Sequence, residues 1–142
     1  MTTVVYRGGI VAADRRVTNG GWVMFDTDVK LTHLPDGRIL AETGDSCSVG
    51  ALKAWVAGDR TGKQPDGDCR IIEFSAESIV VFEGCGSYPM NPNGFYAWGS
   101  GSVPALGALH AGATAIRAVE IAALVDPCTG GGVDFIAVGS KE

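Results

Sequence analysis

The 142-residue chain lacks the features that define several large protein classes. No apolar run approaches the roughly 20 residues that a membrane-spanning helix needs. The first residues show neither the basic segment nor the apolar core of a signal peptide. The net charge is −5, and no basic patch of the kind that binds phosphate backbones is present. We therefore expect a cytoplasmic protein that binds neither membranes nor nucleic acids.

Metal and disulfide chemistry are also poorly represented in the sequence. The four cysteines are irregularly spaced, and no two of them form a CxxC pair. Such spacing does not suit a zinc site, and a disulfide framework is not expected without an export signal. The two histidines are isolated, and there is no GxSxG motif of a serine hydrolase. We expect neither a metal nor a cofactor.

The length and composition fit one domain over residues 1–142. Short β-branched segments dominate the first part of the chain, and turn sequences such as Gly8-Gly9 and Pro35-Asp36-Gly37 separate them. This pattern predicts a hairpin-rich antiparallel block. The expected strands are residues 2–7, 9–14, 21–26, 29–34 and 38–43.

The spacing of apolar residues then changes to that of a helix. Val49, Leu52 and Val56 predict a helix over residues 46–57, and residues 58–68 read as a polar loop. Strands and helices in this segregated order predict an α+β layered sandwich. The remaining expected elements are strands at 69–75, 78–84, 94–100 and 131–140, with helices at 103–110 and 114–125.

The chain begins MTTVV, and two readings of this start are open. Many intracellular proteins begin with Met-Thr without being enzymes. Removal of Met1, however, would give Thr2 a hydroxyl and a free amine on one residue, a nucleophile and a base together. Asp14 and Lys30 also allow two interpretations. They are either exposed charges at strand ends or a pair across adjacent strands beside Thr2, where the lysine favours the deprotonated hydroxyl and amine.

Taken in order, several segments resemble the proteasome β-subunit family and its bacterial relative HslV, which are N-terminal-nucleophile (Ntn) hydrolases. The resemblance covers nearly the whole chain. It implies a four-layer αββα sandwich of two antiparallel sheets, the Ntn-hydrolase fold. One outer helix is missing, since only the loop 58–68 stands where the family has a second long helix. The matching segments are TTVV (2–5), VAADRRVT (11–18), DVKLTHL (28–34), ETGDS (42–46), WGSGS (98–102), ALGALHAG (105–112) and AVEIAALVDPCTGGGVD (118–134).

The resemblance also implies a chemistry, that of a threonine peptidase working without a cofactor. Thr2 would be the nucleophile and its α-amine the general base. Lys30 would tune both groups, Asp14 would orient Lys30, and the N–H of Gly44 would contribute to an oxyanion hole. A threonine stands at 129 where the family usually has serine. The supporting shell around the amine would consist of Ser100, Asp126 and Thr129.

Substrate binding follows from the same resemblance. A peptide or unfolded protein would bind as an added strand, with main-chain contacts near Thr18 and Gly44. Two acidic residues at the first specificity pocket suggest a preference for a basic side chain before the scissile bond. The residues expected around this pocket are Val17, Asp28, Glu42 and Ser46.

Family members act in self-compartmentalising assemblies, so the resemblance implies a homo-oligomeric ring, with an ATPase unfoldase as a candidate partner. Two other functions stay open at this point. One is a catalytically silent assembly subunit that retains Met1. The other is an Ntn amidase that acts on a small molecule.

Overall fold

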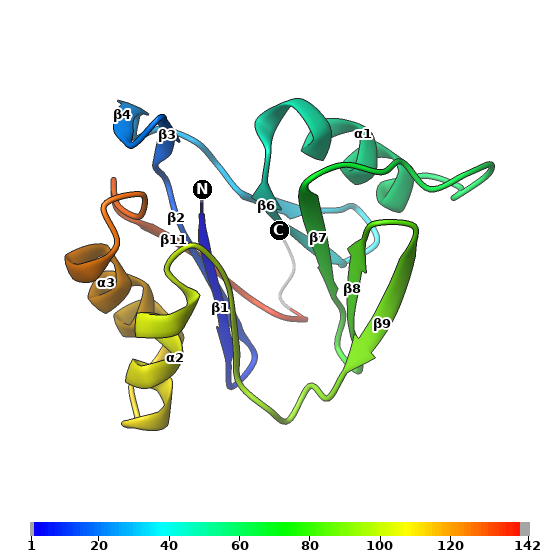
Figure 1. The fold of residues 1–142 in the computed structure, drawn as a ribbon. Coiled ribbons are helices and arrows are strands. Elements are labelled where there is room, and N and C mark those ends of the chain that lie inside the picture. Colours follow the sequence, from blue (N-terminus) through cyan, green and yellow to red (C-terminus); the bar gives the residue numbers. More distant parts are fainter. Residues whose placement is uncertain (1, 140–142) are drawn as a thin grey trace.

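The computed structural model describes residues 2–139, which form two sheets packed face to face between helices (Figure 1). The first sheet has the strand order β10-β1-β2-β11 and is antiparallel throughout. Its strands, in that order, span Tyr96–Gly99, Thr3–Arg7, Ile10–Asp14 and Val133–Ala137.

The second sheet has the order β5-β6-β7-β8-β9 and is also antiparallel. Apolar side chains from both sheets form the core between them. Tyr6 of the first sheet stacks on Phe74 of the second, with ring centroids 5.4 Å apart. The strands β5 to β9 span Leu31–His33, Ile39–Gly44, Cys69–Phe74, Ile79–Glu83 and Gly86–Met90.

Helices cover the two outer faces. Helices α2 (Ser102–His110) and α3 (Ala115–Val125) pack on the first sheet, where small buried alanines let the helices lie close to the strands. Helix α1 (Ser46–Ala57) packs on the second sheet through Leu52 and Val56. The Asp45 carboxylate caps α1 by accepting a hydrogen bond from the Cys47 N–H.

The predicted α+β sandwich and its αββα layering are confirmed, and the described residues contain three helices. Residues 58–68 form a loop, as expected. Two strands were missed. Strand β9 reads GSYPM and is largely exposed, so it has no apolar alternation to reveal it. Strand β3 (Val17–Asn19) pairs with β4 (Trp22–Phe25) in a separate two-stranded ribbon outside both main sheets.

The expected positions of Lys30 and Thr2 need correction. Lys30 does not lie within a strand but directly before β5, because the chain crosses there from the β3–β4 ribbon to the second sheet. Asp14 ends β2 of the first sheet, so the two residues come from facing sheets and not from adjacent strands. Strand β1 begins at Thr3, and Thr2 precedes it. The predicted loss of Met1 lies outside the described residues.

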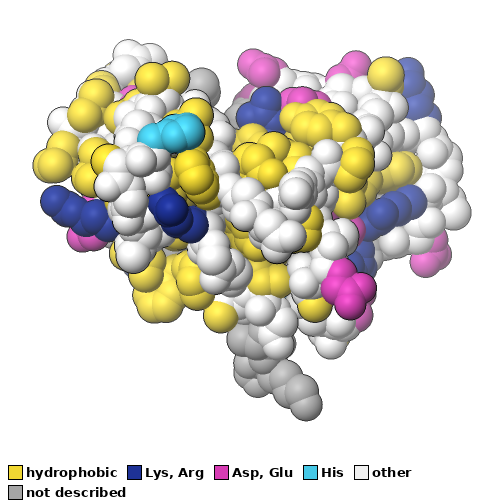
Figure 2. Space-filling view, turned by 90° about the horizontal axis from the view of Figure 1, so that it is seen from below, with side chains coloured by type: hydrophobic (Ala, Val, Ile, Leu, Met, Phe, Trp, Pro, Cys, Tyr) yellow, Lys and Arg dark blue, Asp and Glu magenta, His cyan; other side chains and the backbone are white. Residues whose placement is uncertain are grey.

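The surface shows scattered charge at the end of the sandwich away from the start of β1. Apolar side chains gather over the middle of this face, and its basic side chains lie apart from one another (Figure 2). No helix within residues 2–139 combines the length and apolarity needed to cross a membrane.

Candidate active site

A buried ion pair joins the two sheets near the start of the chain. Lys30 is 2% exposed and Asp14 is fully buried. The Lys30 ammonium donates to Asp14 Oδ1 and to the Arg16 carbonyl, each at 2.7 Å. Asp14 also accepts the N–H groups of Thr3 and Gly130, each at 3.0 Å. Because these hydrogen bonds compensate its burial, the pair fixes the relative positions of four chain segments.

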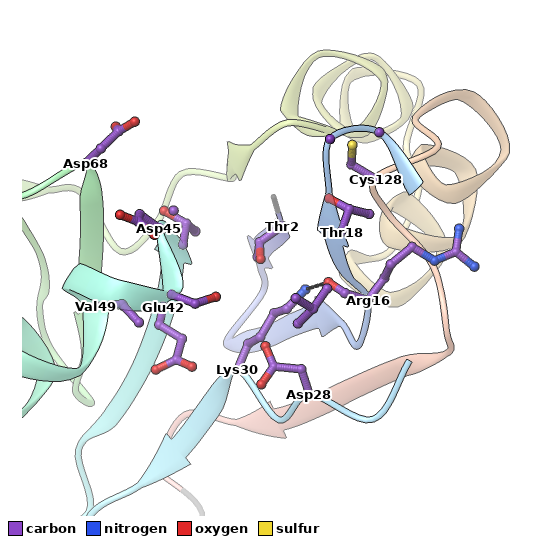
Figure 3. A pocket seen from close by; sticks show the side chains of 16 residues that line it. Thr2, Arg16, Thr18, Asp28, Lys30, Glu42, Asp45, Val49, Asp68 and Cys128 are labelled. Carbon is purple, nitrogen blue, oxygen red and sulfur yellow. Dashed lines mark hydrogen bonds between the residues drawn. The ribbon is translucent and has the colours of Figure 1, made fainter. Parts of the chain in front are cut away.

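Thr2 lies directly beside this pair. It is 6% exposed, and its side chain points toward the end of the Lys30 side chain (Figure 3). Gly99 of β10 packs against its backbone. A Cβ atom at Gly99 would lie 1.6 Å from the Thr2 carbonyl oxygen, and the φ angle of +99° also favours glycine. Main-chain packing therefore fixes where Thr2 lies.

A second hydrogen-bonded chain reaches the neighbouring residue, Thr3. Asp126 Oδ2 accepts from Ser100 Oγ at 2.6 Å and from Thr129 Oγ1 at 2.7 Å. Thr129 Oγ1 in turn lies 2.6 Å from Thr3 Oγ1. Burial raises the pKa of Asp126, but the hydrogen bonds from Ser100, Thr129 and the Cys128 N–H outweigh it and hold this pKa below its ordinary value. Asp126 is therefore held as a carboxylate at neutral pH.

Gly44 ends β6 on the other side of Thr2. Its φ angle is +104°, and a Cβ there would lie 2.5 Å from the Asp68 carbonyl oxygen. The next residue, Asp45, donates its N–H to the same oxygen at 2.8 Å. Helix α1 begins at Ser46, so its positive dipole end faces this region. Negative charge that develops beside Gly44 would be stabilised there.

Thr2 lies where two cavities meet. One has a volume of about 350 Å³ and is lined by Thr2, Lys30 and Gly44 among others. The second, of about 780 Å³, also includes Thr2 and Gly44. Among residues 2–139, no three potential metal ligands come together. The first cavity brings together all the residues named for substrate binding: Val17, Thr18, Asp28, Glu42 and Ser46.

Several residues that build the site were missed at the sequence level. Arg16 holds Lys30 through its carbonyl oxygen, a role that no side-chain pattern could reveal. Its guanidinium pairs with Asp26 at 2.9 Å, and this contact raises the pKa of Arg16 and lowers that of Asp26. Thr3 and Gly99 lie in the matching segments TTVV and WGSGS, so their neighbourhood was identified but not their contacts.

Comparisons with known proteins agree with this architecture. No protein-family model and no curated protein matches the sequence. Among solved structures, HslV from Trypanosoma brucei superposes with a TM-score of 0.70 at 21% identity, covering 96% of this chain and 98% of that one. The chain has the HslV fold. BPH from Thiobacillus denitrificans in complex with epoxomicin superposes with a TM-score of 0.66 at 19% identity, covering 98% of this chain and 99% of that one. BPH without that compound superposes with a TM-score of 0.66 at 18% identity, and the match covers 99% of both chains.

The buried ion pair predicts a clear difference between two lysine variants. Lys30→Met leaves the buried Asp14 carboxylate without its cation, so the free energy of unfolding should fall by about 3–5 kcal/mol. Lys53→Met removes a lysine that is 34% exposed in its ion pair with Glu42, and the loss should be about 1 kcal/mol or less. Urea unfolding followed by circular dichroism measures both. Equal losses would contradict the importance of the Asp14–Lys30 pair.

The packing of Gly99 predicts a second difference. Gly99→Ala places a methyl group onto the Thr2 carbonyl, whereas Gly84→Ala meets no atom within 4 Å and has only an unfavourable φ of +58°. The Gly84 variant should lose about 1–2 kcal/mol, and the Gly99 variant should lose at least about 2 kcal/mol more. Thermal unfolding compares the two. Equal midpoint temperatures of unfolding for the two variants would show that Gly99 does not hold Thr2 in place.

Proposed function

We propose that this protein is a threonine peptidase in which Thr2 is the nucleophile after Met1 is removed. The observation that carries the proposal is the position of Thr2, at the junction of two cavities and beside the buried Asp14–Lys30 pair. The HslV fold and the epoxomicin complex of BPH support the same chemistry.

In this mechanism the Thr2 hydroxyl attacks a peptide carbonyl while the α-amine of the same residue accepts the proton. An α-amine has an ordinary pKa of about 8, which suits a base at neutral pH. The positive charge of Lys30 favours the deprotonated hydroxyl and amine. The Gly44 N–H would donate to the oxyanion of the tetrahedral intermediate, and the dipole of α1 assists it.

The α-ammonium then gives its proton to the leaving nitrogen, so collapse of the intermediate releases the amine half of the peptide and leaves an ester on Thr2. Water, activated by the same α-amine, then hydrolyses the ester. Asp126 and its donors Ser100 and Thr129 support this centre by holding the Thr3 hydroxyl and the loop next to it. Thr18 and Gly44 line the cavity beside Thr2, which suits a peptide bound there in extended form.

The proposal includes a homo-oligomeric ring in the cytoplasm that acts on peptides or unfolded proteins. Strand β4 supports assembly, because Trp22, Val23, Met24 and Phe25 are 43–62% exposed in succession. Exposed apolar clusters of this kind mark interaction surfaces. An ATPase unfoldase that supplies substrate is proposed from the sequence resemblance to HslV.

Covalent labelling tests the catalytic role of Thr2. Intact-mass measurement of protein from its native host should show the loss of one methionine. After incubation with epoxomicin it should show one added inhibitor, located at residue 2 by peptide mapping. The reason is that the inhibitor needs both a free hydroxyl and a free amine on the terminal residue.

Thr2→Ala is the matched control, because Met1 is still removed before alanine but the hydroxyl is gone. It should give no adduct and no peptide hydrolysis. Retained Met1 with no adduct would instead support the silent assembly subunit. An adduct on Thr2 without hydrolysis of any peptide would favour the small-molecule amidase.

The assembly part of the proposal has its own measurement. Sedimentation velocity should give a mass several times the 14.7 kDa of one chain. Replacing Trp22 and Phe25 by serine should shift the species toward the monomer, because it removes much of the exposed apolar surface. A monomer for the unmodified protein at micromolar concentration would refute the ring.

A further inference from the structure

We propose that Asp28 makes the cavity beside Thr2 select a basic side chain next to the scissile bond, while Glu42, already paired with Lys53, contributes little. This inference rests on the proposed peptidase function and names its substrate class. It also separates two carboxylates that the sequence presented as equivalent.

The cavity of about 350 Å³ has an excess of negative charge. Its two cationic lining residues are each neutralised by a carboxylate that does not line it. Lys30 pairs with Asp14 at 2.7 Å, and Arg16 pairs with Asp26 at 2.9 Å. The acidic residues of the lining are Asp28, Glu42, Asp45 and Asp68.

Glu42 already has a cation. Its carboxylate lies 3.1 Å from the Lys53 ammonium, which also donates to Thr32 Oγ1 at 3.2 Å. Burial raises the pKa of Glu42, the charge of Asp28 raises it further, and the nearby lysines only partly offset these effects. A substrate cation therefore gains little at Glu42, whose charge Lys53 already counters.

Two of the other acids are also poorly placed to attract a substrate. Asp45 is occupied as the N-cap of α1. Asp68 lies at the upper left of the view, apart from Thr2 and Asp28 (Figure 3). Asp28, by contrast, projects from the wall opposite Glu42 (Figure 3), and within residues 2–139 its carboxylate has neither a hydrogen bond nor an ion pair.

The cavity also suits the apolar part of a long basic side chain. Val17 and Val49 line it and can cover the methylene stem while the charged end reaches Asp28. Its volume lies at the lower end of the range for small-ligand sites, roughly 300–1,000 Å³. Arginine or lysine fits this combination of an apolar wall and a carboxylate.

Three fluorogenic peptides that differ only in the residue before the cleaved amide test the inference. They carry arginine, citrulline or leucine there. Citrulline has nearly the shape of arginine but no charge, so the ratio of their kcat/KM values isolates electrostatics. The unmodified protein should favour arginine over citrulline at least tenfold, and Asp28→Asn should lower that ratio at least fivefold.

Two further variants sharpen the test. Lys53→Met frees the Glu42 carboxylate and should raise the arginine-to-citrulline ratio at least twofold. Asp59→Asn removes the same charge as Asp28→Asn from an exposed loop position and should leave the ratio unchanged. An equal fall in the ratio for the Asp28 and Asp59 variants would overturn the role of Asp28.

The outcomes also separate this inference from the function on which it rests. An epoxomicin adduct on Thr2 together with equal cleavage of the arginine and citrulline peptides would overturn the charge selection alone. Preference for leucine with an adduct would do the same. No adduct and no cleavage of any of the three peptides would refute both the peptidase and the selection.

Discussion

The rest of the site depends on the buried contact between Lys30 and Asp14. It is the only point in the described chain at which a cation and a carboxylate are both almost completely buried. Removing two charges from water is costly unless each finds full compensation. Here the compensation comes from main-chain groups of Thr3, Arg16 and Gly130. These segments must therefore meet in one arrangement, and that arrangement sets the position of Thr2.

Charge is distributed around Thr2 in an ordered way. In the proposed mechanism, positive potential comes from the start of α1 on the side where an oxyanion would form, and at short range from the Lys30 ammonium, whose charge Asp14 balances farther away. Negative potential comes from Asp28 on the cavity wall, because Glu42 is already paired with Lys53. Under the proposed function, one centre therefore stabilises a developing anion and attracts a cationic side chain.

The sequence was sufficient for the fold class, and several residues that it named for the candidate site line one cavity beside Thr2. Strand and helix periodicities identified most elements, and their order indicated an α+β layered sandwich, whereas the αββα layering followed from the resemblance to the proteasome β-subunit family. The features that could not be predicted depend on contacts between residues that are far apart in the sequence. Strand β9 forms because β8 offers a partner, not because GSYPM favours a strand. The facing-sheet position of Lys30, the carbonyl role of Arg16 and the packing of Gly99 against Thr2 arise from tertiary arrangement alone.

The way in which Thr2 is held has a consequence for how such a centre can change. Its backbone is fixed by Gly99, and the next residue by the N–H and hydroxyl contacts of Thr3. None of these contacts uses the side chain at position 2. Serine or cysteine there would occupy the same place, so these contacts set where the side chain of residue 2 lies without depending on its chemical identity.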